Sequence, residues 1–110
     1  MTTIEPPLAG LKVVDLSRVL AGPWVTQTLA DMGADVIKVE RPGSGDDTRS
    51  WGPPYFNTGN NEQLSAYFMS ANRGKRSVCI DIATDPGRDL VRSLVKNADV
   101  FVENFKVGDM

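Results

Sequence analysis

The sequence predicts an α/β fold in which a parallel sheet is built from two βαβ units. Short apolar runs, typical of buried strands, alternate with segments that have helical periodicity. The second half also echoes the first: residues 33–40 read GADVIKVE and residues 97–103 read NADVFVE. Two βαβ units in series imply parallel strands with right-handed crossovers. Ligands of open α/β sheets bind at the carboxyl edge, where these acidic residues are expected.

The first unit begins with an apolar run at residues 11–16 (LKVVDL), which predicts a buried strand. A turn at residues 21–23 then starts a helix, with Pro23 at the first helical position. Gly33 is a suitable residue to end this helix, and residues 36–39 predict the next strand. The expected buried face of the helix consists of apolar and small side chains: Trp24, Val25, Thr28, Leu29 and Met32.

The second unit follows a short helix expected at residues 63–70, in which Leu64, Tyr67 and Phe68 face inward. Asp85 and Pro86 form a strong helix start, because aspartate caps and proline tolerates the first turn. The remaining elements are expected in chain order as a basic turn at 72–76, a strand at 77–82 and a strand at 100–102.

A long segment at residues 41–62 is rich in Gly, Pro, Asn and Ser and is predicted to be a functional loop. Its aromatic residues, Trp51, Tyr55 and Phe56, favour a packed or functional loop over a disordered linker. The GSGDDTR run at 43–49 lacks the spacing of a calcium loop, so we expect aspartate side chains to cap local N–H groups there.

Composition excludes several classes of function. The 110 residues allow one domain or part of a larger one. A net charge of −2 argues against sequence-independent nucleic-acid binding, and the absence of histidine excludes a Ser-His-Asp site and disfavours zinc. The single Cys79 lies in an apolar run and is interpreted as a buried small hydrophobe. Without histidine ligands, we also expect no bound metal. Because the sequence has no apolar span and no leader pattern, we expect a cytoplasmic protein that does not associate with membranes.

Three short motifs are candidates for ligand binding. Small residues at 19–23 (VLAGP) precede a helix start, which attracts anions, but they match neither GxGxxG nor a Walker loop. Glu40 and Arg41 follow a strand, where an acid can bind ribose hydroxyls and an arginine can bind phosphate. The basic turn at 72–76 is either a solvated turn or an anion platform.

Four linked motifs, in the same order and spacing, resemble the start of the family III CoA transferases. They are PLAGLKVVDLSRVLAGP, LADMGADVIKVERPGSGDDTRSWGPP, NRGKRSVCIDI and ADVFVENF, and together they cover nearly all of residues 7–108. The resemblance implies that residues 1–110 form an N-terminal, Rossmann-like, CoA-binding part of a larger protein. It also assigns CoA contacts by position, to Val19, Leu20, Ala21, Arg41, Ile80, Asp81, Ile82, Ala83, Asn104, Phe105 and Lys106.

Two of these positions depart from the family pattern. Lys106 replaces the common glycine, and Arg18 stands where some members have histidine. The GDDTRSWGPP segment is most similar to that of transferases acting on dicarboxylates.

The resemblance further implies a reaction in which CoA moves from an acyl-CoA donor to a free carboxylate. The intermediates are an aspartyl anhydride and a thioester on an aspartate beyond this chain, so this chain holds no catalytic residue. CoA is then a substrate and not a bound cofactor, the second substrate is a small carboxylic acid, and the full-length protein is an interlocked homodimer. Two alternatives remain open here: an acyl-CoA racemase of the same family, which abstracts the alpha proton, and a non-catalytic nucleotide-binding module.

Overall fold

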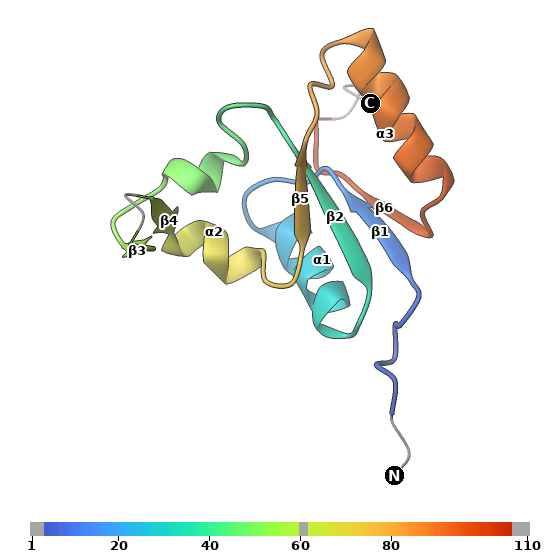
Figure 1. The fold of residues 1–110 in the computed structure, drawn as a ribbon, viewed down its shortest axis with the longest axis horizontal. Coiled ribbons are helices and arrows are strands. Elements are labelled where there is room, and N and C mark those ends of the chain that lie inside the picture. The colour runs from blue at the N-terminus through green and yellow to red at the C-terminus, as the bar shows by residue number, and fades with distance from the viewer. Residues whose placement is uncertain (1–3, 60–61, 107–110) are drawn as a thin grey trace.

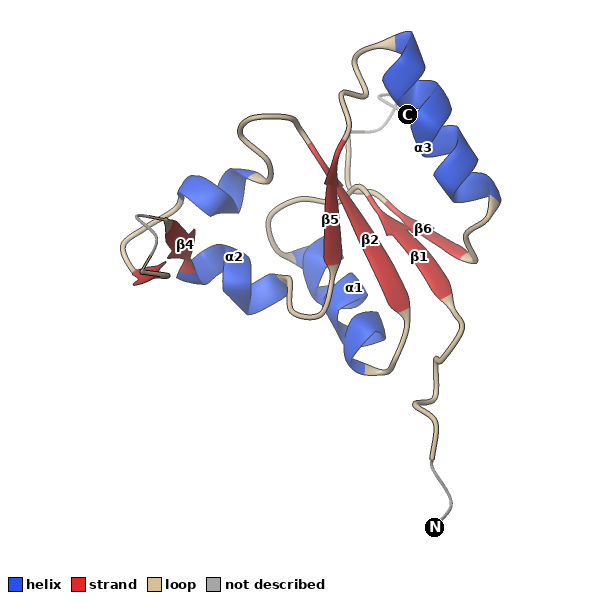
Figure 2. Ribbon diagram, viewed as in Figure 1, coloured by secondary structure: helices blue, strands red, loops and turns tan. Residues whose placement is uncertain are grey.

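The computed structural model describes residues 4–59 and 62–106, and its centre is a parallel sheet with a helix on each face (Figures 1 and 2). The elements of this layered core are β1 (Lys12–Asp15), α1 (Ala21–Asp31), β2 (Asp35–Glu40), β5 (Arg76–Cys79), α3 (Asp85–Lys96) and β6 (Val100–Val102). The sheet has the order β5-β2-β1-β6, and each neighbouring pair is parallel. The predicted α/β fold with a parallel sheet is therefore confirmed.

The order of the strands reverses beside β1. The first βαβ unit places β2 on one side of β1, with Val13 paired with Val36. The second unit runs from β5 through α3 to β6, which pairs with the other side of β1, at Val13 and Val100. The loops that follow β1 and β6 therefore lie next to each other at the carboxyl edge, and such a switch point is where doubly wound sheets bind ligands.

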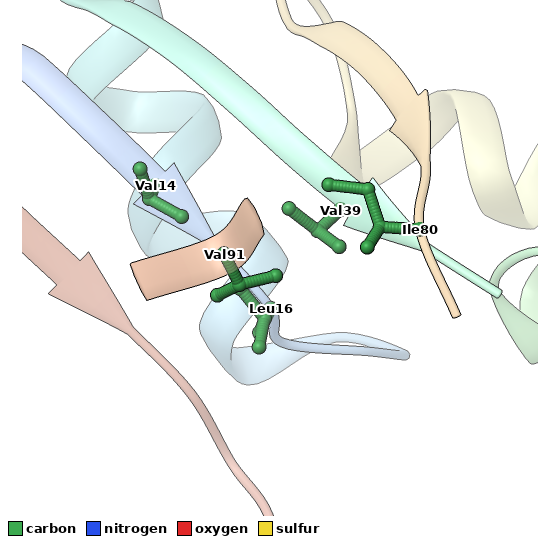
Figure 3. Packing of buried hydrophobic residues seen from close by; sticks show 5 residues of the cluster. All are labelled: Val14, Leu16, Val39, Ile80 and Val91. Carbon is green, nitrogen blue, oxygen red and sulfur yellow. The ribbon is translucent and has the colours of Figure 1, made fainter. Parts of the chain in front are cut away.

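Two apolar clusters fill the spaces between the sheet and its helices. On the α3 face the buried members are Val14, Leu16, Val39, Ile80 and Val91, which Figure 3 shows gathered where α3 crosses the strands. On the α1 face they are Val13, Ala34 and Val36, with Leu29 and Ala30 of the helix packed against them. Because the central strands β1 and β2 are buried on both faces, near-continuous apolar runs are what these two strands require.

Helix α1 differs from the prediction in its start and in its buried face. It begins at Ala21, and its buried residues are Pro23, Thr26 and Gln27. Trp24 and Val25, which were predicted to be buried, are 53% and 54% exposed. Two polar side chains are buried in their place because each has hydrogen-bond partners: Thr26 Oγ1 donates to Asp15 (2.5 Å) and Gln27 Nε2 donates to the Ser70 carbonyl (3.1 Å).

The segment at 41–62 has more regular structure than a loop. It contains a 3₁₀ turn, η1 (Asp47–Ser50), and a strand, β3 (Tyr55–Asn57), which pairs antiparallel with β4 (Gln63–Ser65); residues 60 and 61 of the predicted loop lie outside the described residues. The expected cap is confirmed, because Asp46 accepts a hydrogen bond from the backbone of Thr48.

The short helix predicted at 63–70 is α2 (Ala66–Ala71), which begins three residues later because β4 occupies the start of that stretch. Tyr67 was predicted to face inward, but it is 47% exposed. Its ring packs edge-on against Trp51, with the ring centroids 6.0 Å apart.

Three smaller predictions are also wrong. The cap of α3 is Thr84, whose Oγ1 accepts from the N–H of Gly87 (3.1 Å), and Asp85 is the first helical residue. Strand β5 ends at Cys79, three residues earlier than predicted. Cys79, predicted to be buried, is exposed on β5, an edge strand of the described sheet. Among the described helices, none is both long and apolar enough to cross a membrane.

Candidate functional site

The candidate site lies at the carboxyl edge of the sheet, where the loops after β1 and β6 meet. Asn104 joins the two loops through its amide side chain. Its Oδ1 accepts from the N–H of Arg18 (3.1 Å), and its Nδ2 donates to the Arg18 carbonyl (2.8 Å). A pair of hydrogen bonds of this kind fixes both loops at the switch point without using the Arg18 side chain.

Two cavities open at this edge. The first has a volume of about 160 Å³ and is lined by Leu16, Arg18, Val39, Glu40, Arg41, Ile80, Asp81, Ile82, Ala83 and Phe105. The second has a volume of about 310 Å³ and is lined by Arg18, Val19, Leu20, Ala21, Asp47 and Asn104. The structure therefore brings together ten of the eleven residues predicted to contact CoA, and Arg18 belongs to both cavities. Lys106 is exposed and lines neither of them.

The turn between β1 and α1, at residues 17–22, can pass close to a ligand because it is tightly packed. At Gly22 a Cβ would overlap the side chain of Ser17, so only glycine fits there. Ser17 is in turn held by Asp15 Oδ1, which accepts from both its N–H (2.8 Å) and its hydroxyl. The end of β1 and the start of α1 are thus locked together directly under residues 19–21.

Glu40 is not free to bind ribose hydroxyls. Its carboxylate accepts two hydrogen bonds from the guanidinium of Arg49 (2.7 Å each), one from Ser77 Oγ and one from the N–H of Asp46 (2.8 Å). Burial opposes its ionisation, but these hydrogen bonds outweigh that effect and lower the pKa of Glu40 to about 2. Glu40 is therefore a charged structural group that holds η1 against β2.

Arg41 is the more accessible member of this pair. Its side chain is 51% exposed, and its guanidinium contacts Asp47 in an exposed ion pair. Exposed ion pairs contribute little to stability, so an incoming phosphate can replace the carboxylate at small cost. This arrangement favours Arg41 over Glu40 as a ligand contact.

The basic turn at 72–76 is not a free anion platform. Arg73 pairs with Asp31 (2.6 Å), Arg76 pairs with Asp35 (2.7 Å), and Lys75 is buried against Asp15 (3.1 Å). Burial lowers the pKa of Lys75 to about 8, although Asp15 favours its charged form. The turn is interpreted better as a structural clamp on β1 and α1.

The segment at 80–83 is held in place by α3. Asp81 Oδ1 accepts from the N–H of Ala83 (3.0 Å), and the guanidinium of Arg88 donates to the carbonyls of Ile82 (3.3 Å) and Ala83 (3.2 Å). This backbone forms one wall of the smaller cavity. The position of α3 therefore determines the shape of that wall.

Arg18 was not among the predicted contacts, because the resemblance offered no matching residue at its position. In the structure its guanidinium carbon lies 5.4 Å from the centroid of the Phe105 ring, on the wall shared by the two cavities. A cation held over an aromatic face at this distance is stabilised while remaining able to bind an anion. Its place in the turn between β1 and α1, at the carboxyl edge of the sheet, is a sequence signal that points to this role.

Comparison with known proteins gives a consistent result. The sequence profile described as CoA-transferase family III matches residues 8–110. The chain is 59% identical over 107 residues to a succinate–glutarate CoA-transferase of Agrobacterium fabrum, covering 96% of this chain and 27% of the relative. It is 50% identical to the human succinyl-CoA:glutarate CoA-transferase, covering 94% of this chain and 23% of the relative. It is also 44% identical to an acetyl-CoA:oxalate CoA-transferase of Acetobacter aceti, covering 94% and 25%.

Solved structures agree with this result. A CaiB/BaiF family protein from Brucella suis superposes with a TM-score of 0.89 at 61% identity, covering 96% of this chain and 27% of that one. The protein Rv3272 from Mycobacterium tuberculosis superposes with a TM-score of 0.81 at 39% identity, with 96% and 28% covered. This chain thus spans about a quarter of the length of the relatives it matches. It belongs to the family III CoA transferases.

Proposed function

We propose that this chain forms the CoA-binding part of a CoA transferase that moves CoA from an acyl-CoA donor to a free carboxylate. One observation carries the proposal: residues from four separate loops, each assigned to CoA by position, line two cavities at the switch point of the sheet. The cavities share Arg18, and Arg41 lines the smaller one. Two arginines beside apolar walls suit a ligand that has phosphates at one end and a thin pantetheine arm.

The acceptor in this proposal is a small dicarboxylate. The similar proteins named above transfer CoA to or from succinate, glutarate or oxalate, according to their names. The chemistry would proceed through an aspartate outside this chain, which forms an anhydride and then a thioester. Such covalent catalysis divides a difficult exchange between carboxylates into easier steps. The full-length protein is proposed to be a homodimer.

Substitution of Arg41 tests the site. In the full-length protein, Arg41→Ala should weaken CoA binding about tenfold, because it removes a charge-assisted contact to phosphate. Isothermal titration with CoA measures this directly. The matched control is Arg92→Ala, which removes another arginine from an exposed ion pair, on α3. Equal affinity of wild type and Arg41→Ala would contradict the assignment of Arg41, and no binding of CoA by wild type would contradict the proposed function itself.

A further inference from the structure

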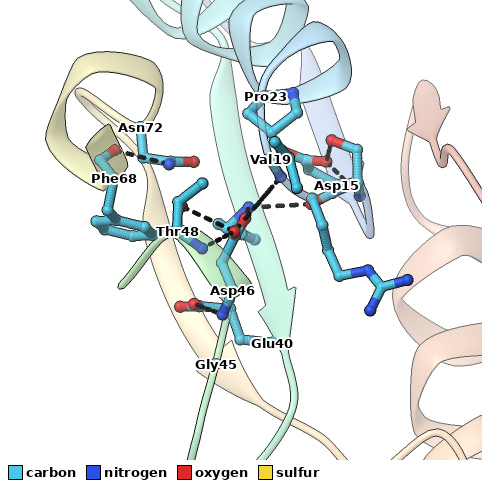
Figure 4. A network of polar contacts seen from close by, with 12 residues as sticks. Asp15, Val19, Pro23, Glu40, Gly45, Asp46, Thr48, Phe68 and Asn72 are labelled. Carbon is cyan, nitrogen blue, oxygen red and sulfur yellow. Dashed lines mark hydrogen bonds and ion pairs between the residues drawn. The ribbon is translucent and has the colours of Figure 1, made fainter. Parts of the chain in front are cut away.

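We propose that Asp46 and Lys38, which form an ion pair beneath the first turn, are positioning residues that set the backbone of residues 17–20 for the ligand. From the sequence, Asp46 was expected only to cap local N–H groups and Lys38 had no assigned role, and neither residue lines the two cavities. The inference rests on the proposed function, since CoA is the ligand used to test it. Figure 4 shows Asp46 at the centre of the polar network, with Val19, Thr48 and Asp15 around it.

The first observation is the backbone of Val19. Its φ is 72°, and it is the one residue other than glycine with a positive φ among residues 4–59 and 62–106. A β-branched side chain is strongly disfavoured in this region, so the surrounding structure must hold the residue there. Strain of this kind is concentrated at binding and catalytic sites. Val19 and its two successors line the larger cavity, which places this strain at the candidate site.

The second observation is what holds Val19 in place. The Val19 N–H points at the Asp46 carboxylate, with its nitrogen 3.4 Å and 3.3 Å from the two oxygens. Asp46 is itself fixed by Thr48, which donates from its N–H (2.9 Å) and its hydroxyl (2.8 Å). A fixed negative charge directly below the turn therefore favours the orientation of the peptide N–H that the positive φ produces.

Lys38 completes the arrangement from the other end of the turn. Its Nζ lies 2.9 Å from Asp46 Oδ2 and donates to the carbonyl of Ser17 (3.0 Å). One ion pair thus binds a carbonyl at the start of the turn and an N–H two residues later. Removing the charge of either side chain would therefore weaken the contact at one end of the turn.

Stability alone does not account for this pair. The side chains of Lys38 and Asp46 are 1% and 0% exposed, and desolvation of two such charges cancels much of their attraction. Burial also opposes ionisation of Asp46, yet hydrogen bonds from Thr48 and the nearby Lys38 charge keep its pKa below the usual range. Apolar residues of similar size often replace such pairs without loss of stability. The distinctive contribution of the pair is the two backbone contacts.

The experiment compares wild type with Asp46→Asn in the full-length protein. Asparagine keeps the shape but removes the charge, so the turn should leave its strained conformation more often. The dissociation constant for CoA should rise about tenfold, because a hydrogen bond to a charged group is lost. Independently of CoA, hydrogen exchange of a peptide spanning residues 16–22 should become faster in the unliganded protein.

A second substitution separates positioning from general damage. Glycine adopts a positive φ without strain, so in a Val19→Gly background the turn depends less on Asp46. The effect of Asp46→Asn on CoA affinity should then shrink from about tenfold to about threefold or less, as a double-mutant cycle measures. An unchanged effect in both backgrounds would overturn the proposal, and so would an unchanged exchange rate at 16–22.

If Asp46→Asn fails to fold, the double variant Lys38→Met with Asp46→Leu takes its place, because it removes both charges of the pair and leaves neither unpartnered. The proposal expects this protein to fold and to bind CoA weakly, because Val19 N–H and Ser17 C=O have lost their partners. Full CoA affinity in the paired variant would overturn the proposal. If wild type binds CoA and Arg41→Ala weakens that binding, such a result contradicts the positioning role alone and leaves the proposed function intact.

Discussion

Carboxylates at the end of a parallel strand look like ligand contacts, but here they mostly bind the protein itself. Asp15 is fully buried and accepts from Ser17, Thr26 and Lys75. Glu40 is held by Arg49 and Ser77 in the same way. A sequence shows that an acid follows a strand, but not which distant donors reach it. For this reason the residue pattern alone left Glu40 and Arg41 open as alternatives, and the contacts of each separate them.

Glu40→Gln should make the free energy of unfolding less dependent on pH in the acid range. The pKa of Glu40 is lowered from 4.5 to about 2 in the folded protein, so its stabilising contribution is complete above pH 4.5. That contribution is lost as the pH falls from 4.5 toward 2, and its full size is on the order of 3 kcal/mol. Urea denaturation at several pH values should therefore show a gap between wild type and Glu40→Gln at pH 7 that narrows in acid.

The control for this experiment is Glu5→Gln, because Glu5 is exposed in the N-terminal segment. Its denaturation midpoint should follow that of wild type at each pH. A gap between wild type and Glu40→Gln that stays constant from pH 7 to pH 3 would show that the carboxylate charge of Glu40 is not what stabilises the site.

At the scale of the element, the strands were predictable and the buried faces of the helices were less so. Apolar runs such as LKVVDL are typical of strands buried on both faces of a sheet, and β1 lies within that run. Helix α1 misleads because its apolar residues, such as Trp24 and Val25, are exposed while Thr26 and Gln27 are buried. Periodicity counts apolar side chains, whereas burial of these polar ones depends on partners from other elements. The structure of the 41–62 segment depends in the same way on pairing of β3 with β4.

Gly87→Ala should loosen the docking of α3, although alanine is the better helix former. A Cβ at position 87 would overlap the carbonyl oxygen of Asp81, which is backbone and cannot turn aside. We expect a loss of about 1–3 kcal/mol, typical of overpacking, together with weaker CoA binding as the 80–83 wall shifts. Thermal denaturation and CoA titration measure the two effects.

Ser93→Ala serves as the control for Gly87→Ala, since it changes an exposed position on the same helix and should stay within about 0.5 kcal/mol of wild type. A Gly87→Ala protein as stable as wild type would show that the end of α3 can move away from Asp81 without cost.

At the scale of the whole molecule, the sequence predicted that the loops after the strands share the carboxyl edge, because parallel strands place them at the same edge of a sheet. It did not predict the cavities' shared Arg18, nor the Lys38–Asp46 pair below them. Those depend on side chains packing across loops that are far apart in sequence. The sequence also left open how much of the sheet its helices cover. Helix α3 covers only part of one face, and a cavity of about 380 Å³ remains beside β5, lined by apolar residues including Ile37, Val78 and Leu90.

This apolar surface predicts that the isolated 110-residue chain associates in solution. Leu90 is 52% exposed and Val78 is 36% exposed beside the cavity, and Trp24 and Val25 are exposed on the opposite face. Exposed apolar side chains beside such a cavity are typical of an interface. In the relatives, the rest of the polypeptide is available to cover this surface, since this chain spans only 27% of the Agrobacterium fabrum protein.

Sedimentation velocity over a range of concentrations should show a sedimentation coefficient that rises with concentration, and Leu90→Glu should reduce that rise. Arg92→Gln is the matched control, because it lowers the net charge by one, as Leu90→Glu does, at an exposed position of α3 that lines neither cavity bordered by Leu90. A chain that stays monomeric at every concentration would contradict the prediction and show that this apolar face can remain exposed to solvent without causing association.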